Sequence, residues 1–349
     1  MSSPADPALD PVARLVLDEA VAVAGDLAGR EVLVVDDVAL AAAARDAGGR
    51  VRAWLDDRRD ADAAEAAGVV LADPWAEDPL PVELVLGRLP TALSALDDLA
   101  ERVAARAPAQ VRVVLGGRVK HMTRSQNDVL ARHFGEVSAS LGRQKSRVLH
   151  AAGPRPGERR WPRTSVLDEP ALGQPLTLLG RGAVFAEGRL DAGTRLLLQA
   201  LSPALDRGPR EADALDLGSG SGVLATWLAR RGLATRAVDV SAAAVESTRL
   251  TAGAADVEVD AAWSEGLAEV APASVDLLVS NPPFHRGAAK DSTPTLQMID
   301  DAARVLRPGG ELWLVWNAHL PYLPRLRRAV GRTEVVRRDP HYLVTRSVR

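Results

Sequence analysis

The sequence predicts an α/β protein built from two tandem, Rossmann-like doubly wound sheets, of which the N-terminal one is degenerate. Short apolar runs alternate with helical patterns along most of the chain, which is typical of sheets covered by helices. The chain has 349 residues, a length that favours two domains over one. Turns able to hold a ligand follow the strands of the second half but not those of the first. We therefore expect one functional half and one degenerate half.

The composition narrows the class of protein. Hydrophobic residues make up 47% of the chain, and no apolar run approaches the roughly 18 residues of a membrane span. Cysteine is absent, which excludes disulfides and thiolate metal sites and favours a cytoplasmic location. The six histidines are scattered without ligand spacing. We expect a cytoplasmic monomer with no metal and no membrane partner.

Charge is segregated along the chain. Residues 1–110 carry 21 acidic and 10 basic side chains, whereas residues 116–163 carry 11 basic and 3 acidic ones. Residues 325–349 carry 8 arginines and 2 acidic residues. Such basic segments favour a partner with a phosphate backbone, although arginine-rich stretches also solvate surfaces.

The first half, residues 1–152, has the architecture without the ligand-binding turns. Where a cofactor loop is expected, Asp36 and Asp37 follow the first strand with no glycine, so the backbone cannot approach a ligand and carboxylates would repel an anion. After the fourth strand the chain reads Gly87-Arg88-Leu89-Pro90. Helices are expected over 12–28, over the alanine-rich run that ends at Ala47, and over 93–107. Strands are expected over 31–37, 51–55, 69–71, 82–86 and 111–115.

Two basic loops close the first half. They cover residues 116–124 and 140–148 and include Arg118, Lys120 and Lys145. Each loop alone is typical of a solvated surface, but together they predict a docking surface for RNA phosphates. The proline-rich stretch 153–170 that follows has no apolar periodicity and is expected to be an interdomain linker, leaving residues 171–349 as the second domain.

The second half opens with a helix after Asp191, which is expected to cap it. A strand then runs into a loop with Asp216, Gly218, Gly220 and Gly222. This G-x-G-x-G spacing differs from the dinucleotide fingerprint, and an acid precedes it. A carboxylate there repels pyrophosphate but suits a cationic amino-acid group, so the loop favours S-adenosyl-L-methionine over NAD.

Two further acids extend this cofactor site. Asp239 ends the next strand and is placed to accept both ribose hydroxyl hydrogens. Asp260 is expected at the end of a third strand over 257–262, within reach of the adenine amine, although it also suits a turn. A fourth strand over 275–280, a helix over 295–306 and a strand over 311–316 complete the sheet.

The fourth strand leads into Asn281-Pro282-Pro283-Phe284, followed by His285. Two prolines end the strand in a rigid turn, at the edge where open α/β sheets bind ligands. The Asn281 side-chain oxygen and the Pro282 carbonyl can accept both hydrogens of an exocyclic NH2 group, while Phe284 stacks on a planar ring. We also place Asn281 beside the cofactor. The motif alone is equally compatible with a plain strand-terminating loop, and His285 with a packed loop residue.

The chain resembles the ribosomal RNA guanine-N2 methyltransferases that are built from two methyltransferase-like halves, of which the second binds the cofactor. The resemblance covers nearly the whole length and rests on 190–194, 216–222, 281–285 and 317–322. It implies the class I methyltransferase fold, with S-adenosyl-L-methionine held by Asp216 to Gly222 and Asp239 and the guanine held by Asn281 to Phe284. Ser219 and Ser221 replace a more usual Cys and Asn. Asp260 and Ala261 stand where the family commonly has Asn.

Three alternative functions remain open from the sequence. An adenine-N6 methyltransferase and a protein-glutamine methyltransferase share the same planar NH2 target, and the phenylalanine and the basic segments favour RNA. A non-catalytic RNA-binding relic of the fold is the third. The intact Asp216, Gly218 and Asn281 argue against a relic, since the first half illustrates what their loss looks like. We expect ribosomal RNA, or a ribosomal subunit, to be the partner.

Overall fold

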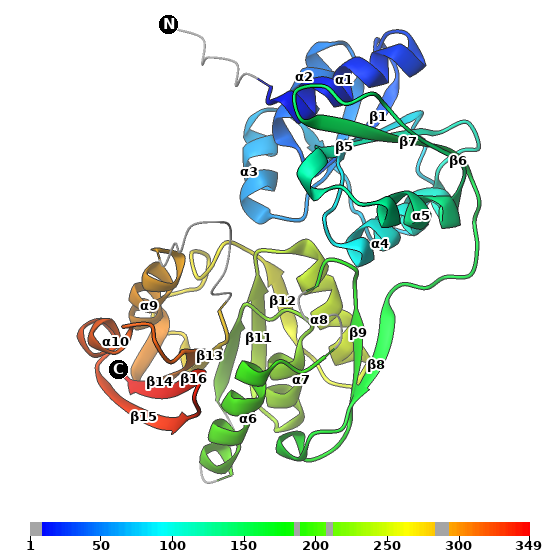
Figure 1. Ribbon diagram of the computed structural model, residues 1–349. Helices are drawn as coiled ribbons and strands as arrows, with labels where there is room; N and C mark the ends of the chain where they lie inside the picture. Colours follow the sequence, from blue (N-terminus) through cyan, green and yellow to red (C-terminus); the bar gives the residue numbers. More distant parts are fainter. Residues whose placement is uncertain (1–8, 185–188, 207–211, 283–292) are drawn as a thin grey trace, which may run out of the picture. The chain divides into compact units, whose positions relative to one another are not determined.

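The computed structural model describes residues 9–184, 189–206, 212–282 and 293–349, and the chain divides into two compact units (Figure 1). Unit 1 spans residues 1–161 and unit 2 spans residues 162–349. The boundary falls inside the stretch 153–170 that was expected to be a linker. Part of that stretch is ordered into strands, as described below.

Unit 1 is a seven-stranded sheet with helices on both faces. Its central strands are short apolar runs whose side chains are almost all buried, as expected for strands covered on two sides. The elements are α1 (Pro11–Ala24), β1 (Glu31–Val35), α2 (Val38–Asp46), β2 (Arg50–Trp54), α3 (Arg58–Ala66), β3 (Val70–Leu71), β4 (Leu84–Arg88), α4 (Leu93–Arg106), β5 (Arg112–Arg118), η1 (Val119–His121), α5 (Arg124–His133), β6 (Phe134–Ala139) and β7 (Ser146–Pro154).

The strand order of unit 1 is β3-β2-β1-β4-β5-β7-β6. The first five strands of this order are parallel, and β7 and β6 are antiparallel to their neighbours. The expectation of a doubly wound sheet is confirmed, and the two strands at one edge of this sheet run antiparallel to their neighbours. Residues 140–148, expected to be a loop, include the start of β7.

Alternate residues of each strand face different helices, so the core of unit 1 has two layers. Leu33 and Leu115 belong to a cluster with α4 and α5. Gly116, one residue further along β5, faces Val12 and Val16 of α1, and an added Cβ would lie 2.4 Å from a methyl of Val16. This close approach explains why glycine stands in a strand, where it otherwise costs stability.

Unit 2 repeats the arrangement. A two-stranded antiparallel sheet of β8 and β9 precedes the main sheet in the chain, and β9 packs against α8. The elements are β8 (Arg163–Leu167), η2 (Pro170–Leu172), β9 (Leu176–Gly180), α6 (Ala192–Leu205), β10 (Asp213–Leu217), α7 (Val223–Arg230), β11 (Ala234–Asp239), α8 (Ala242–Ala254), β12 (Asp260–Trp263), β13 (Val275–Ser280), α9 (Thr293–Val305), β14 (Leu306–Asn317), α10 (Leu323–Ala329), β15 (Arg332–Arg338) and β16 (Tyr342–Val348).

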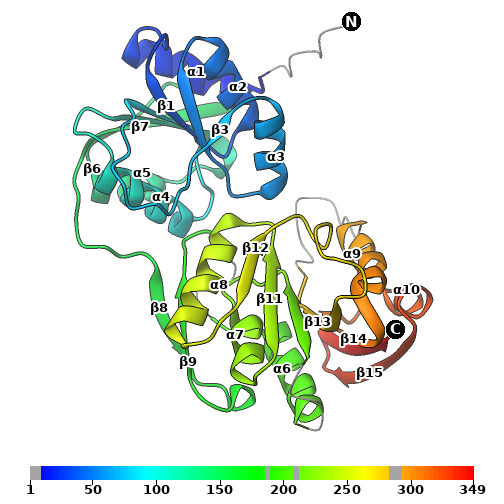
Figure 2. The ribbon, with the colours of Figure 1, turned by 180° about the vertical axis from the view of Figure 1, so that it is seen from behind.

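The main sheet of unit 2 has the order β12-β11-β10-β13-β14-β16-β15, which is the order of unit 1 position by position. One face packs on α6 and α7 and the other on α9 and α10, and both views in Figures 1 and 2 show helices on the two sides of this sheet. The carboxyl ends of β10, β11, β12 and β13 therefore meet along one edge. Among the described residues, no helix is long and apolar enough to cross a membrane.

Candidate active site

The glycine-rich loop after β10 has the backbone that its sequence requires. Gly218, Gly220 and Gly222 have φ angles of 78°, 55° and 79°, a region that disfavours other residues. Above Gly218 and Gly220 there is open space, because an added Cβ would meet no atom within 4 Å. The loop thus exposes bare backbone at the carboxyl edge of the sheet, which is what close approach of a cofactor needs.

Gly222 has a different role in the same loop. It is the N-cap of α7, and an added Cβ would lie 2.7 Å from the Cα atom of Thr248 in α8. Thr248 also holds the loop through its hydroxyl, which lies 2.9 Å from that of Ser219 and 3.3 Å from the Gly220 carbonyl. Thr248 was not singled out from the sequence, because a threonine in a helix carries no motif of its own.

Asp216 lies beneath the loop and not on its surface. Its Oδ2 accepts a hydrogen bond of 2.9 Å from the Ala225 N–H, while its Oδ1 is buried and has no hydrogen-bond partner among the described residues. Burial raises the pKa of this carboxyl to about 7, with the Asp239 charge adding to the rise. A cation above the loop would favour the ionised form, so Asp216 suits the charge of a sulfonium or ammonium group.

Asp239 ends β11 and supports the same loop. Its Oδ2 accepts from the Gly220 N–H at 3.0 Å and its Oδ1 accepts from the Ser241 N–H at 2.9 Å. These bonds fix the carboxylate at the carboxyl end of β11, beside the glycine-rich loop. Open glycine backbone, a buried acid with an orphaned oxygen and a strand-end carboxylate together fit the polar parts of S-adenosylmethionine.

The expectation that Asp260 ends the third strand was wrong. Asp260 opens β12 and pairs with Arg236, three residues before the end of β11. At about 3.3 Å per residue, it lies roughly 10 Å from the carboxyl edge. The residue level with Asp239 is Trp263, whose indole N–H donates to the Val240 carbonyl at 2.9 Å. The Val-Glu-Val-Asp alternation had suggested a strand that begins three residues before the observed start of β12.

Asn281 is brought directly beside the glycine loop. Leu217 and Ser280 are paired in neighbouring strands, so the residues that follow them, Gly218 and Asn281, leave the sheet at the same level. The buried Ser280 hydroxyl donates to the Leu217 carbonyl at 2.7 Å, which ties the two strand ends together. The structure therefore unites the glycine loop and Asn281 at one edge.

The side-chain amide of Asn281 is held by the start of α6. Its Nδ2 donates to Asp191 Oδ1 at 3.0 Å and to Thr194 Oγ1 at 2.9 Å. Because a carboxylate only accepts, the atom facing Asp191 must be the NH2 group, and Oδ1 is left to accept from a substrate. An added Cβ on Gly193 would lie 3.3 Å from both amide atoms, so the backbone of Gly193 also confines the amide.

Asp191 thus serves two purposes at once. Its Oδ1 caps α6 by accepting from the Gly193 and Thr194 N–H groups, and its Oδ2 accepts from the Thr194 hydroxyl at 2.5 Å. The cap was expected from the sequence, but the bond to Asn281, 90 residues away, was not. Of the predicted turn, Pro282 is buried, while Pro283, Phe284 and His285 lie outside the described residues.

Unit 1 has the same geometry with the chemistry replaced. Asp10 caps α1 as Asp191 caps α6, and Arg88 stands at the position of Asn281. The Arg88 guanidinium reaches Asp10 at 2.9 Å and Asp37 at 2.6 Å. Asp36, at φ 49°, occupies the position of Gly218. An ion-pair network of side chains therefore fills the edge that is open in unit 2.

The basic residues predicted to dock RNA gather on unit 1. Arg118 ends β5, and its guanidinium donates to the Gln144 carbonyl at 3.2 Å. The Val119 N–H donates to the Lys145 carbonyl at 3.0 Å, so the two basic segments lie side by side. Lys120 and Lys145 are exposed. Arg118 is partly engaged in holding the neighbouring turn.

The arginines near the C-terminus differ in their surroundings. Arg325 and Arg346 form ion pairs with acidic residues of unit 2. Arg337 and Arg338 are exposed at the end of β15, level with the carboxyl end of β14 through β16. That edge is the one on which Asn281 lies. Among the described residues no group of three or more His, Asp or Glu is arranged to hold a metal ion.

The fold and the site define a class I methyltransferase that uses S-adenosylmethionine. The model of the methyltransferase small domain matches residues 175–346, and that of the RLMG N-terminal domain matches residues 17–155. The chain belongs to the ribosomal RNA large subunit methyltransferase G family. A relative with that name from Streptomyces avermitilis is 36% identical, over 77% of this chain and 71% of the relative. Another from Pseudomonas paraeruginosa is 37% identical, over 76% and 71%.

A solved structure is similar over almost the whole length. It is the T. thermophilus 16S rRNA N2 guanine methyltransferase RsmC, in complex with AdoMet and guanosine. The TM-score is 0.79 at 25% sequence identity, and the match covers 98% of this chain and 92% of that chain. The expected fold, two tandem class I methyltransferase-like halves, is confirmed.

Proposed function

We propose that this protein transfers the methyl group of S-adenosylmethionine to the exocyclic N2 amine of a guanine in large-subunit ribosomal RNA. The observation that carries the proposal is the fixed amide of Asn281, which presents an acceptor oxygen beside the open glycine loop. The guanine is supported by the guanosine bound to RsmC, and the large subunit by the names of the more similar relatives.

S-adenosylmethionine, when bound, supplies an electrophilic methyl group on a sulfonium. The chain's own part is to position the amine, whose lone pair is delocalised into the guanine ring. The guanine amine would donate one hydrogen bond to Asn281 Oδ1 and another to the Pro282 carbonyl. These two bonds would turn the amine towards tetrahedral geometry and free its lone pair. Such fixed acceptors lower a barrier mainly by orientation and electrostatics. The extra proton can leave after transfer, so no strong base is needed.

The remaining predicted residues take supporting roles in this proposal. Gly218, Gly220 and Gly222 shape the cofactor loop, Asp216 places a buried negative charge under it, and Asp239 receives the ribose hydroxyls. Phe284 would stack on the guanine and His285 would contact the RNA. Asp260 has no role here, because β12 places it away from the edge. The reaction needs no metal, since a sulfonium is activated without a Lewis acid, and we propose that the protein works as a cytoplasmic monomer.

Replacement of Asn281 by alanine tests the proposal. Asn281→Ala should reduce methyl transfer to deproteinised ribosomal RNA by at least roughly a hundredfold, because a positioned acceptor is lost. The dissociation constant of S-adenosylmethionine, measured by calorimetry, should stay within a few fold of wild type. Retained turnover would remove Asn281 from the mechanism.

Mass mapping of the product separates this function from its rivals. A methyl group on adenine N6, or on a protein glutamine, would replace the guanine assignment while leaving the site intact. A protein that binds RNA but not S-adenosylmethionine would be a relic of the fold. The open glycine loop of unit 2, compared with the filled edge of unit 1, argues against the relic.

A further inference from the structure

The turn between β6 and β7 holds an unusual backbone. Arg143 and Ser146 exchange two backbone hydrogen bonds of 2.9 Å, so Gln144 and Lys145 form a two-residue hairpin turn. Their φ angles are 50° and 60°, the left-handed values of a type I′ turn. Such turns favour Asn-Gly, because other residues are strained there. This turn carries neither residue.

Neighbouring elements hold the strained turn in place. The Arg118 guanidinium donates to the Gln144 carbonyl, and the Val119 N–H donates to the Lys145 carbonyl. Arg143 forms an ion pair with Asp18 of α1. The conformation is therefore fixed by contacts from β5, η1 and α1, while the side chain of Lys145 stays exposed. Strain that surrounding structure enforces is concentrated at functional sites.

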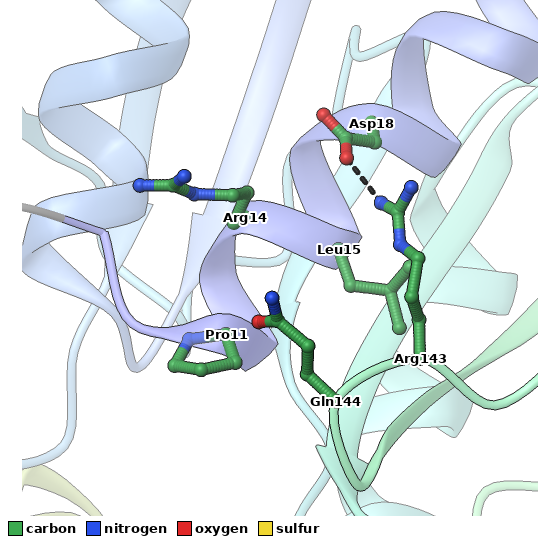
Figure 3. A pocket seen from close by; sticks show the side chains of 6 residues that line it. All are labelled: Pro11, Arg14, Leu15, Asp18, Arg143 and Gln144. Atoms are coloured by element: carbon green, nitrogen blue, oxygen red, sulfur yellow. Dashed lines mark hydrogen bonds and ion pairs between the residues drawn. The ribbon is translucent and has the colours of Figure 1, made fainter.

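The turn also borders a recess of about 200 Å³ beside α1. Arg14 also lines this recess, and Figure 3 shows the Gln144 amide near Pro11, the Arg14 guanidinium pointing away from that amide, and the Arg143–Asp18 pair on the other side. Arg14 is exposed. The rim thus offers a guanidinium and an amide, both of which can donate to phosphate oxygens.

We propose that the Gln144–Lys145 turn is an RNA-docking tip that grips the sugar–phosphate backbone of the substrate outside the active site. The proposal rests on the function proposed above and assigns its RNA contact to particular residues. Charge favours RNA over a protein partner, because residues 116–163 carry 11 basic and 3 acidic side chains. Lys145 and Lys120 face solvent on segments that are hydrogen-bonded together. The left-handed backbone is retained despite its cost because it presents the side chains of Gln144 and Lys145.

The test is a variant turn that should make unit 1 more stable and bind RNA more weakly. Gln144→Asn with Lys145→Gly installs the sequence that a type I′ turn prefers and removes the charge. We expect the melting temperature of unit 1 to rise by roughly 3–8 °C, as strain is relieved at two positions. Binding to deproteinised large-subunit ribosomal RNA should weaken, and the slope of log K against log salt should become shallower by about 0.7–0.9, the value for one phosphate contact. S-adenosylmethionine binding should not change.

Two control variants accompany this test. Lys145→Arg keeps both the charge and the strained backbone, and it should bind RNA as wild type does. Ala273, in an exposed turn of unit 2, has a left-handed backbone with φ 47°. Ala273→Gly relieves the strain at this position and should raise the stability of unit 2 without altering RNA binding.

Three outcomes would overturn the proposal. The first is a double variant, Gln144→Asn with Lys145→Gly, that is stabilised but binds RNA like wild type. The second is the same double variant without any gain in stability. The third is a Lys145→Arg variant that loses as much RNA affinity as the double variant. Failure of the proposed function would look different, because wild-type protein would then transfer no methyl group to the RNA.

Discussion

Replacing the buried Asp216 by asparagine should make the stability of unit 2 less dependent on pH. The carboxyl is 1% exposed and receives one hydrogen bond, from the Ala225 N–H. Burial, with a smaller contribution from the Asp239 charge, raises its pKa from 3.8 to about 7. Asparagine resembles the protonated form, since its oxygen can still accept from Ala225 and it carries no charge.

The sign and size of the effect follow from the two pKa values. Between pH 3.8 and about 7 the folded protein holds the Asp216 proton and the unfolded chain has released it. The free energy of unfolding therefore falls by about 1.4 kcal/mol per pH unit across this window, about 4 kcal/mol in all, and is level above it. About 2 kcal/mol of that loss lies between pH 5 and pH 7. The asparagine variant has no such group, so the contribution is absent from it.

Urea unfolding of cofactor-free protein at pH 5, 6, 7 and 8 measures the difference. Hydrogen exchange of peptides from each unit reports the two units separately, and unit 1 serves as the internal control. The stability of wild type relative to Asp216→Asn should decline from pH 5 to pH 7 and then stay constant. A difference that is the same at all four pH values would refute a raised pKa. Because a bound cation favours the carboxylate, wild-type affinity for S-adenosylmethionine should also rise over this range, and that of the variant should not.

Two more predictions concern the catalytic edge. Asp191→Ala should lower single-turnover methyl transfer roughly ten- to a hundredfold, because Asn281 is then free to turn its NH2 group towards the amine; loss of the helix cap should cost about 1 kcal/mol in urea unfolding. Asp191→Asn keeps a capping oxygen, so it should lose activity with less loss of stability, and equal activity to wild type would contradict the orienting role. Arg337→Ala with Arg338→Ala should raise the RNA KM but not change kcat, whereas Arg332→Ala, at the opposite end of β15, should leave both unchanged.

Sequence patterns predicted the parts of this protein that depend on local backbone demands. The glycines at 218, 220 and 222 indicate a loop with left-handed backbone, and the short apolar runs predict the strands of the sheet. The bond between Asp191 and Asn281 could not be found in this way, because it depends on the register of β10 and β13. The hairpin of β6 and β7 was missed for a different reason. Most residues of β6 are exposed, and a Gln-Lys turn lacks the Asn or Gly by which such turns are recognised.

The comparison of the two units also explains how one half can keep the fold without the chemistry. A capping aspartate at the first helix and a polar residue after the fourth strand are common to both. In unit 2 the partner of that aspartate is a short amide, which leaves space above the glycine loop. In unit 1 it is Arg88, long enough to reach Asp37 across the same edge. Its ion pairs with Asp10 and Asp37 place charged side chains across the edge that stays open in unit 2, so the same fold is kept without an open site.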